Sequence, residues 1–227
     1  MRRAAAWGVH LFTASSAPAG VLAILAAVHG EARVALLWMA FTIAVDGIDG
    51  TLARALDVKR VLPFIDGARL DDIVDYFTYV VVPAVFMLQF GLFPPAVAVP
   101  VALAPVLASA LGFARTDAKT TDHFFTGFPS YWNIVAFYLY ALGWPPAANA
   151  AVVLVLAALV FVPIRYVYPS RTVHWRGLTI TLGILWAGLV LASLATAQPS
   201  RVLAVLSLLF PVYYLGLSFY LHRQRAS

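Results

Sequence analysis

Cysteine is absent from the 227-residue sequence, and charged residues are scarce. Without cysteine, disulfides, thiolate nucleophiles and zinc–thiolate sites are excluded, so any metal must be held by oxygen or imidazole. Only 11% of the residues are charged, whereas 63% are hydrophobic, and the mean hydropathy is +0.88. Soluble globular domains do not have this composition, which predicts a chain that lives in a lipid bilayer.

Apolar segments recur along the whole length, each long enough to cross a hydrocarbon core of about 30 Å as a helix. Their positions predict an all-α fold, a polytopic membrane bundle of about eight helices. The connections between them leave no room for a soluble domain, so we expect one integral-membrane domain over residues 1–227. The predicted spans are 12–29, 33–54, 71–93, 96–114, 129–143, 147–165, 177–196 and 201–221.

Basic residues are distributed unevenly about these spans. If the N-terminus is cytoplasmic, only Arg33 and Arg201 of the 15 lysines and arginines fall on the outer side. The excess of basic residues on one side predicts that both termini and the connections that carry the charged residues are cytoplasmic. The pI near 9.7 then reflects topology and contact with anionic lipid rather than nucleic-acid binding.

Acidic residues are concentrated in one region, because seven of the ten lie within thirty positions. Asp46 and Asp49 are spaced i, i+3 near the inner end of the second span, and Asp71 and Asp75 are spaced i, i+4 at the start of the third. Each pair shares one helix face. Four carboxylates brought together at a membrane surface need a compensating charge, so the pattern predicts bound divalent metal. Oxygen ligands favour Mg²⁺ or Mn²⁺.

An alternative is that these aspartates are ordinary charges at the membrane surface, paired with Arg54, Lys59, Arg60 and Arg69. This alternative explains Asp57 easily, and Asp66 as well, but it leaves the spacing of the other four unexplained.

Small residues between the carboxylates suggest that a helix backbone or a bulky ligand approaches closely. Arg54 is placed either to bind an anionic phosphate or to extend from the helix end into water. The small residues meant here are Gly50, Ala53 and Gly67, and they lie between the carboxylates together with Arg54.

The complete pattern is D-x2-D-G-x2-A-R over 46–54, followed by G-x3-D-x3-D over 67–75. It resembles the signature of the CDP-alcohol phosphotransferase family. Most members place eight residues between the two halves, whereas this chain has twelve, 55–66. The longer spacer and the phrases RLDDIVDYFTYVVVPAVF (69–86), KTTDHFFTGFPSYWNIVAFYLY (119–140) and FVPIRYVYPSRT (161–172) resemble a bacterial branch whose acceptor is choline.

The resemblance implies an enzyme with a six-helix core that transfers the phosphatidyl group of CDP-diacylglycerol to choline and releases CMP. It implies that Asp46, Asp49 and Asp71 are ligands of two metal ions, and that Asp75 is both a ligand and the catalytic base. It further implies a homodimer in the bacterial inner membrane, in contact with membrane lipid. The residues expected to contact the CDP moiety are Asp49, Gly50, Ala53, Arg54 and Gly67.

Choline carries a quaternary ammonium group, which aromatic faces backed by a carboxylate recognise well. Tyr76 adjoins Asp75, and Tyr131 and Trp132 lie in one of the phrases just quoted, so these three are the candidates for an aromatic cage. Tyrosine and tryptophan also collect at membrane interfaces whatever their function, which is the competing explanation. Asp72 points about 100° away from Asp71 on the helix and either supports the metal site or faces the choline cation.

Lys119, Arg165 and Arg171 lie at the same predicted level as the aspartates. They either bind lipid or nucleotide phosphate or only follow the charge distribution of the inner loops. The five histidines lack ligand spacing and are not predicted to bind metal. The polar tract 13–16 and Asn133 are expected to cap helices or to form hydrogen bonds between helices.

Three other functions compete with this prediction. One of them, a non-catalytic membrane scaffold, leaves the spacing of the carboxylates unexplained. A cation transporter would also use intramembrane aspartates, but its site should lie near the bilayer midplane on interrupted helices and not beside arginines. The same fold and chemistry could also serve serine, glycerol phosphate or inositol phosphate. A phosphorylated alcohol would require an additional basic pocket, whereas choline would require aromatic rings.

Overall fold

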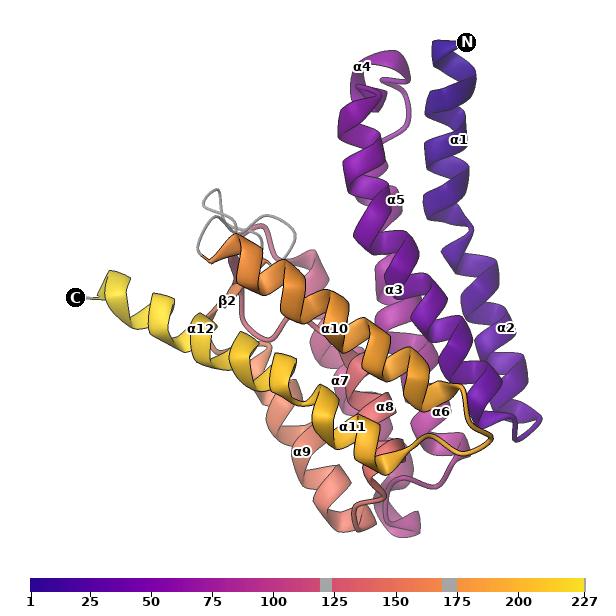
Figure 1. Ribbon diagram of the computed structural model, residues 1–227, viewed down its shortest axis with the longest axis vertical. Coiled ribbons are helices and arrows are strands. Elements are labelled where there is room, and N and C mark those ends of the chain that lie inside the picture. Colours follow the sequence, from indigo (N-terminus) through magenta and orange to yellow (C-terminus); the bar gives the residue numbers. More distant parts are fainter. Residues whose placement is uncertain (119–123, 169–174, 227) are drawn as a thin grey trace.

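The computed structural model describes residues 1–118, 124–168 and 175–226, and helices dominate it (Figure 1). The first half contains α1 (Arg2–Ala14), α2 (Ser16–Val28), α3 (Ala32–Ala55), α4 (Val58–Val61), α5 (Gly67–Asp75), the π-helix η1 (Tyr76–Val81) and α6 (Val82–Gln89). The remaining elements are the 3₁₀ turn η2 (Pro95–Val97), α7 (Ala98–Ala114), β1 (Phe124–Thr126), α8 (Trp132–Leu142), α9 (Pro146–Leu159), β2 (Arg165–Val167), α10 (Arg176–Leu194), α11 (Arg201–Ser207) and α12 (Leu209–Ala226).

The helical, membrane-spanning character of the chain is confirmed. Within the described residues, five helical segments are long and apolar enough to cross a membrane: Arg2–Val28, Ala32–Ala55, Pro95–Ala114, Arg176–Leu194 and Arg201–Gln224. Helices α8 and α9 are apolar but shorter. The third predicted span corresponds to α5, η1 and α6, which follow one another directly. Every predicted span therefore coincides with a helical segment.

Two predicted boundaries are wrong. The first helix begins at Arg2 instead of near residue 12, and α9 ends at Leu159 instead of near residue 165. Pro163 lacks an N–H and disfavours helical backbone at the residue before it, so the chain cannot continue as a helix there. Residues 165–167 instead form β2, which pairs with β1 in an antiparallel sheet of two strands. The sequence did not predict this sheet.

Helices α2 and α3 pack closely through small side chains. Ala19, Ala23 and Ala35 are at most 2% exposed and let the two backbones approach each other. The main buried cluster continues from these helices into α6, α7 and α8, and it includes Phe86 and Trp132. Figure 1 shows α1, α4 and α5 standing side by side beyond the end of this core, while α10, α11 and α12 cover another side of the bundle.

The π-helix η1 has a local cause. Pro83, near the start of α6, has no N–H to donate, and the N–H of Val82 bonds to the carbonyl of Phe77, five residues back. The wider turn shifts the register of the side chains that follow Asp75 relative to a regular α-helix. Tyr79 lies within η1 and is directed at α3, where it meets an aspartate of the candidate site.

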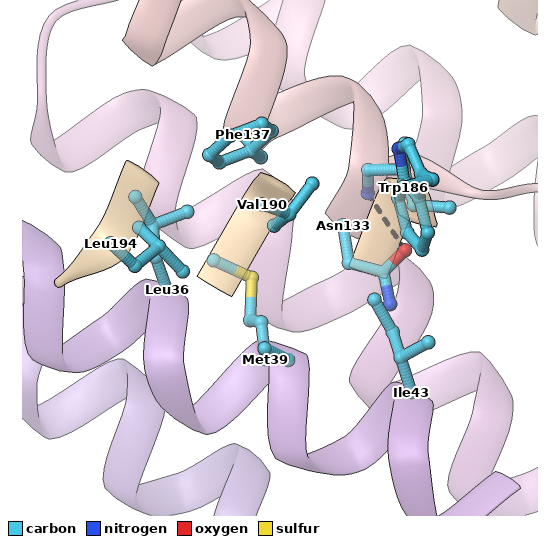
Figure 2. Close-up of a pocket in the computed structure, with 10 residues that line it drawn as sticks. Leu36, Met39, Ile43, Asn133, Phe137, Trp186, Val190 and Leu194 are labelled. Carbon is cyan, nitrogen blue, oxygen red and sulfur yellow. Dashed lines mark hydrogen bonds between the residues drawn. The ribbon is translucent and has the colours of Figure 1, made fainter. Parts of the chain in front are cut away.

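A small apolar cavity of about 20 Å³ lies in the core between α3, α8 and α10. Figure 2 shows Met39, Val190 and Leu194 around it, together with Asn133, whose Oδ1 accepts the N–H of Ile134 in the first turn of α8. The N-cap of α8 is Tyr131 and no side chain of the described residues caps the helix, so the expected capping role of Asn133 is wrong, because this residue lies inside the first turn and its side chain bonds only to its neighbour there. The Nδ2 of Asn133 is buried without a hydrogen-bond partner among the described residues, and the volume suits one water molecule.

Candidate functional site

Three of the predicted aspartates form a cluster. Asp46 and Asp49 of α3 and Asp71 of α5 each place a carboxylate oxygen within 4.8 Å of the other two. Asp49 is buried at 6% exposure, and the other two are half-buried. The two helix edges therefore meet at Asp71, and three of the four aspartates of the predicted four-carboxylate site come together. All donors are carboxylate oxygens, a set that fits a hard divalent cation and does not favour copper or zinc.

The spacer between the two halves of the motif turns the chain back, so that α5 lies beside α1 and Asp71 reaches the two aspartates of α3. Asp57 adopts a left-handed conformation (φ 50°) and forms an ion pair of 3.0 Å with Arg60. Asp66 caps α5 by accepting the N–H groups of Ala68 and Arg69. Asp57 thus pairs with a nearby arginine, as the alternative explanation expected. Asp66 has a helix-capping role.

Two side chains outside the motif hold the clustered carboxylates. The Thr13 hydroxyl of α1 donates to Oδ2 of Asp49 at 2.8 Å, and the Tyr79 hydroxyl donates to Oδ2 of Asp46 at 2.7 Å. Hydrogen bonds of this kind fix the orientation of a metal ligand. The expected interhelical hydrogen bond in the tract 13–16 is found at Thr13. Its partner, and the role of Tyr79, were not predicted.

Asp75 lies one turn after Asp71 on α5 and is outside the three-residue cluster found among the described residues. Its carboxylate and that of Asp46 are both within electrostatic reach of Tyr79 and Tyr131. Asp75 therefore lies in the same neighbourhood as Asp46 and these two rings. Its roles as metal ligand and base stay predictions.

The glycines of the motif lie where other side chains approach. A Cβ on Gly50 would lie 3.2 Å from Nη1 of Arg54, and a Cβ on Gly67 would lie 3.2 Å from Cε1 of His10. The Arg54 guanidinium also donates to the Thr51 hydroxyl at 3.0 Å. Both glycines thus allow a side chain, that of Arg54 or that of His10, to approach the backbone closely beside the cluster. Ala53 packs against the small buried cluster between α1 and α4.

The structure does not bring the three candidate cage residues together. The Tyr76 hydroxyl donates to the carbonyl of Val106 in α7 at 3.1 Å. Trp132 is fully buried, and its indole N–H donates to Ser109 at 2.8 Å. Both side chains therefore pack against α7. Tyr131, by contrast, lies among other aromatic rings and near two of the aspartates.

We call the rings around Tyr131 the Tyr131 group. The ring centroids of Tyr79, Phe125 and Tyr214 lie 6.2, 6.4 and 6.3 Å from that of Tyr131. Phe125 in turn lies 4.6 Å from Tyr168. The group draws on η1, β1, the residue before α8, the segment after β2, and α12. The short sheet thus carries Phe125 to the ring of Tyr131.

A cavity of about 230 Å³ opens beside this group, and Asp72 and Phe125 both line it. Phe113, Phe128 and Arg115 are among its other lining residues. The Arg115 guanidinium donates to both carboxylate oxygens of Asp117 at 2.8 and 2.7 Å. These hydrogen bonds hold the pKa of the Asp117 carboxyl below its usual value. Arg115 therefore has a partner outside the cavity.

Only one of the three predicted phosphate-binding residues is described. Arg165 lies in β2, and its guanidinium carbon is 6.0 Å from the centre of the Phe124 ring in β1. Lys119 and Arg171 lie outside the described residues. The assignment of all three to phosphate stays a prediction.

Comparison with known proteins connects this geometry to a family. The model of the family described as CDP-alcohol phosphatidyltransferase matches residues 10–191. A protein of Legionella pneumophila named phosphatidylcholine synthase is 47% identical over 168 residues, which are 74% of this chain and 66% of that protein, just under two thirds of its length. A phosphatidylcholine synthase of Pseudomonas aeruginosa is 39% identical over 96% of this chain and 92% of its own length. One from Bradyrhizobium diazoefficiens is 43% identical over 85% of this chain and 72% of that protein.

Proposed function

The chain belongs to the CDP-alcohol phosphatidyltransferase family, and from this premise we propose that it is a phosphatidylcholine synthase. In this reaction the choline hydroxyl attacks the lipid-bearing phosphorus of CDP-diacylglycerol. A phosphorus–oxygen bond forms to choline, the bond to CMP breaks, and the hydroxyl proton passes to a base. The observation that carries the proposal is the carboxylate cluster of Asp46, Asp49 and Asp71 beside the Tyr131 group.

Asp46, Asp49 and Asp71 would hold Mg²⁺ or Mn²⁺, with Asp75 completing a site for two ions. When bound, such ions neutralise the charge of the pyrophosphate and make CMP a better leaving group. The protein keeps these ligands in place through Thr13, on Asp49, and Tyr79, on Asp46. Because both bonds are formed in the protein alone, the carboxylates need little rearrangement when a cation binds.

Asp75 acts as the base in this proposal. It lies beside the Tyr131 group, where it can accept the proton of a choline hydroxyl whose ammonium head is held by the rings. Gly50 lets the Arg54 guanidinium lie close to the backbone of α3 one turn after Asp49, where Arg54 can bind the phosphate of the nucleotide, and Gly67 is expected to contact the CDP moiety as well. Ala53 packs against the small buried cluster between α1 and α4 and so supports this part of α3.

The Tyr131 group supplies the acceptor site. A trimethylammonium group is attracted to aromatic faces within about 6 Å, and the neighbouring carboxylates add to that attraction. Asp72 places a further negative charge in the adjoining cavity of about 230 Å³, which gives a cation a route to Phe125, the neighbour of Tyr131. Tyr76 and Trp132 are assigned to packing against α7 in this proposal.

The membrane arrangement follows from the charges. We place the chain in the bacterial inner membrane as one domain, with both termini and the aspartates on the cytoplasmic side, because basic residues collect on that side. CDP-diacylglycerol then reaches the site from the bilayer, and choline reaches it from the cytoplasm. We also expect a homodimer, an expectation that rests on the family resemblance alone.

The proposal is tested by measuring CMP release from CDP-diacylglycerol by purified protein in detergent, with Mn²⁺ or Mg²⁺ and a panel of alcohols. We expect release with choline, and little with serine, glycerol phosphate or inositol phosphate. If choline releases no more CMP than water while one of the others reacts, the assignment of the acceptor is wrong. If no alcohol releases CMP, the enzyme activity itself is refuted.

The acceptor site has its own test, the pair Tyr131→Phe and Tyr131→Leu. Phenylalanine keeps the aromatic face, whereas leucine removes it. Since a cation–π contact contributes about 0.5–2 kcal/mol, we expect the leucine variant to raise the KM for choline by about 2- to 30-fold and the phenylalanine variant to change it little. Equal KM values in both variants would remove Tyr131 from the acceptor site.

A further inference from the structure

Ser109 on α7 is fully buried and accepts two hydrogen bonds, both from residues that flank Tyr131. The Ser130 hydroxyl donates to Oγ of Ser109 at 2.9 Å, and the indole N–H of Trp132 donates to the same oxygen at 2.8 Å. A hydroxyl oxygen has two lone pairs, so it can accept both bonds at once. The residues immediately before and after Tyr131 are therefore attached to one point on α7.

The backbone at Ser130 needs this support. Its φ is +59°, in the left-handed region, which is unfavourable for a residue with a Cβ unless contacts in the folded protein hold it. The bond to Ser109 is one such contact, and the N–H of Trp132 donates to the carbonyl of Ser130 at 2.8 Å as another. Ser130 is buried and Trp132 fully so, which means that bulk water does not readily replace these partners. The turn leaves Tyr131 among the aromatic rings while Trp132 enters the core.

Helix α7 also holds the residue that follows Asp75. The Tyr76 hydroxyl donates to the carbonyl of Val106, which precedes Ser109 by three residues and lies about one turn from it. One stretch of α7 thus forms hydrogen bonds both with the start of η1 and with the segment 130–132. These bonds set the Tyr131 ring in relation to the helix that carries Asp75.

We propose that Ser109 is a positioning residue for the acceptor site, where it holds the turn 130–132 and thereby directs the Tyr131 ring at the choline cation. This inference rests on the proposed function, because it takes that ring to contact choline. Ser109 acts only through its neighbours, since its own side chain is fully buried. A cation–π contact requires the cation to lie over the ring face within about 6 Å, so a rotated ring binds choline less well.

The test measures the KM for choline in Ser109→Ala, with Ser193→Ala as the matched control. Alanine at 109 leaves two buried donors without their acceptor and releases the turn, so we expect the KM for choline to rise by about 2- to 10-fold. The KM for CDP-diacylglycerol and the Mn²⁺ concentration for half-maximal activity should change by less than about twofold. Ser193 is equally buried, but its hydroxyl bonds to the carbonyl of Ser200 at 3.1 Å and joins α10 to the start of α11. Alanine there should change none of these quantities.

A double-mutant cycle separates positioning from a general loss of stability. If Ser109 acts through Tyr131, Ser109→Ala should raise the KM for choline in the unmodified protein but not in a Tyr131→Leu background, where no ring remains to be directed. The same fold-change in both backgrounds overturns the proposal, and so does an unchanged KM in Ser109→Ala. If Ser109→Ala does not fold, Ser130→Ala takes its place in the cycle with the same criteria, because it removes only one of the two donors and leaves the Trp132 bond intact.

The two proposals fail separately. If choline releases no more CMP than water, the proposed function is refuted. If choline reacts and Tyr131→Leu raises its KM while Ser109→Ala does not, only the role of Ser109 is refuted. If choline reacts and neither variant changes its KM, the acceptor site lies away from Tyr131, and the role of Ser109 fails together with that assignment.

Discussion

Tyr79→Phe removes one hydroxyl, the donor of the 2.7 Å hydrogen bond to Asp46, and leaves the ring beside Tyr131. Tyr79 is only 6% exposed, so bulk water does not readily replace the lost donor. A hydrogen bond to a charged group contributes about 1.5–3 kcal/mol, equivalent to roughly 10- to 150-fold in an equilibrium constant. Partners that orient a metal ligand typically change metal affinity by about 10- to 100-fold. We therefore expect the Mn²⁺ concentration for half-maximal activity to rise at least about tenfold.

The assay measures CMP release against Mn²⁺ concentration at saturating CDP-diacylglycerol and choline. Tyr138→Phe is the matched control, because it removes a buried hydroxyl that shares a 2.8 Å hydrogen bond with Ser207, and that bond joins α8 to α11 and not to the aspartates. The control should leave the Mn²⁺ dependence unchanged. If Tyr79→Phe and Tyr138→Phe show the same Mn²⁺ dependence as the unmodified protein, Tyr79 does not position a metal ligand.

Three further variants test other parts of the site. Thr13→Val removes the hydroxyl that bonds to Asp49 and should raise the Mn²⁺ requirement by about tenfold, measured as for Tyr79; an unchanged requirement contradicts this. Asp75→Asn should keep CMP affinity within about twofold but lower turnover by about 100-fold or more, because it removes the base; near-normal turnover would refute that role. Gly127→Ala should lower the yield of folded protein and its melting temperature. The φ of Gly127 is +85°, and the new Cβ would collide with the carbonyl oxygen of Val160. An unchanged melting temperature would show that this turn can relax.

The aspartate cluster could be predicted because its information is local. Spacings of three and four residues on a helix define a face, and a short connection between two spans allows the faces to meet. The groups that orient these carboxylates could not be found in this way. Thr13 is 36 residues from Asp49, and Tyr79 is 33 residues from Asp46. Tyr79 also lies in a π-helix, so regular helical spacing does not predict where the side chains after Asp75 point.

The acceptor site was predicted only in part, for a related reason. Tyr131 and Trp132 are adjacent in sequence, but Tyr131 precedes α8 and remains beside the aspartates, whereas Trp132 is its first helical residue and turns into the core. Phe125 reaches Tyr131 through a strand of three residues. A strand of that length carries no periodic pattern of its own and exists here because β2 supplies its hydrogen-bond partner. Pairing between distant segments is what the sequence alone did not reveal.

The spacer 55–66 connects the motif to the first helix. It forms α4, whose Val58 and the following Leu62 are buried against Ala6 and Val9 of α1. Ala6 and Val9 precede residue 12, where the first span was predicted to start. The first turns of α1 and the spacer 55–66 therefore pack together as one unit. This unit holds α1 beside α5, and α1 carries both Thr13 and His10. The extra residues of the spacer therefore do more than join two spans, because they position the helix that supports one metal ligand and faces Gly67.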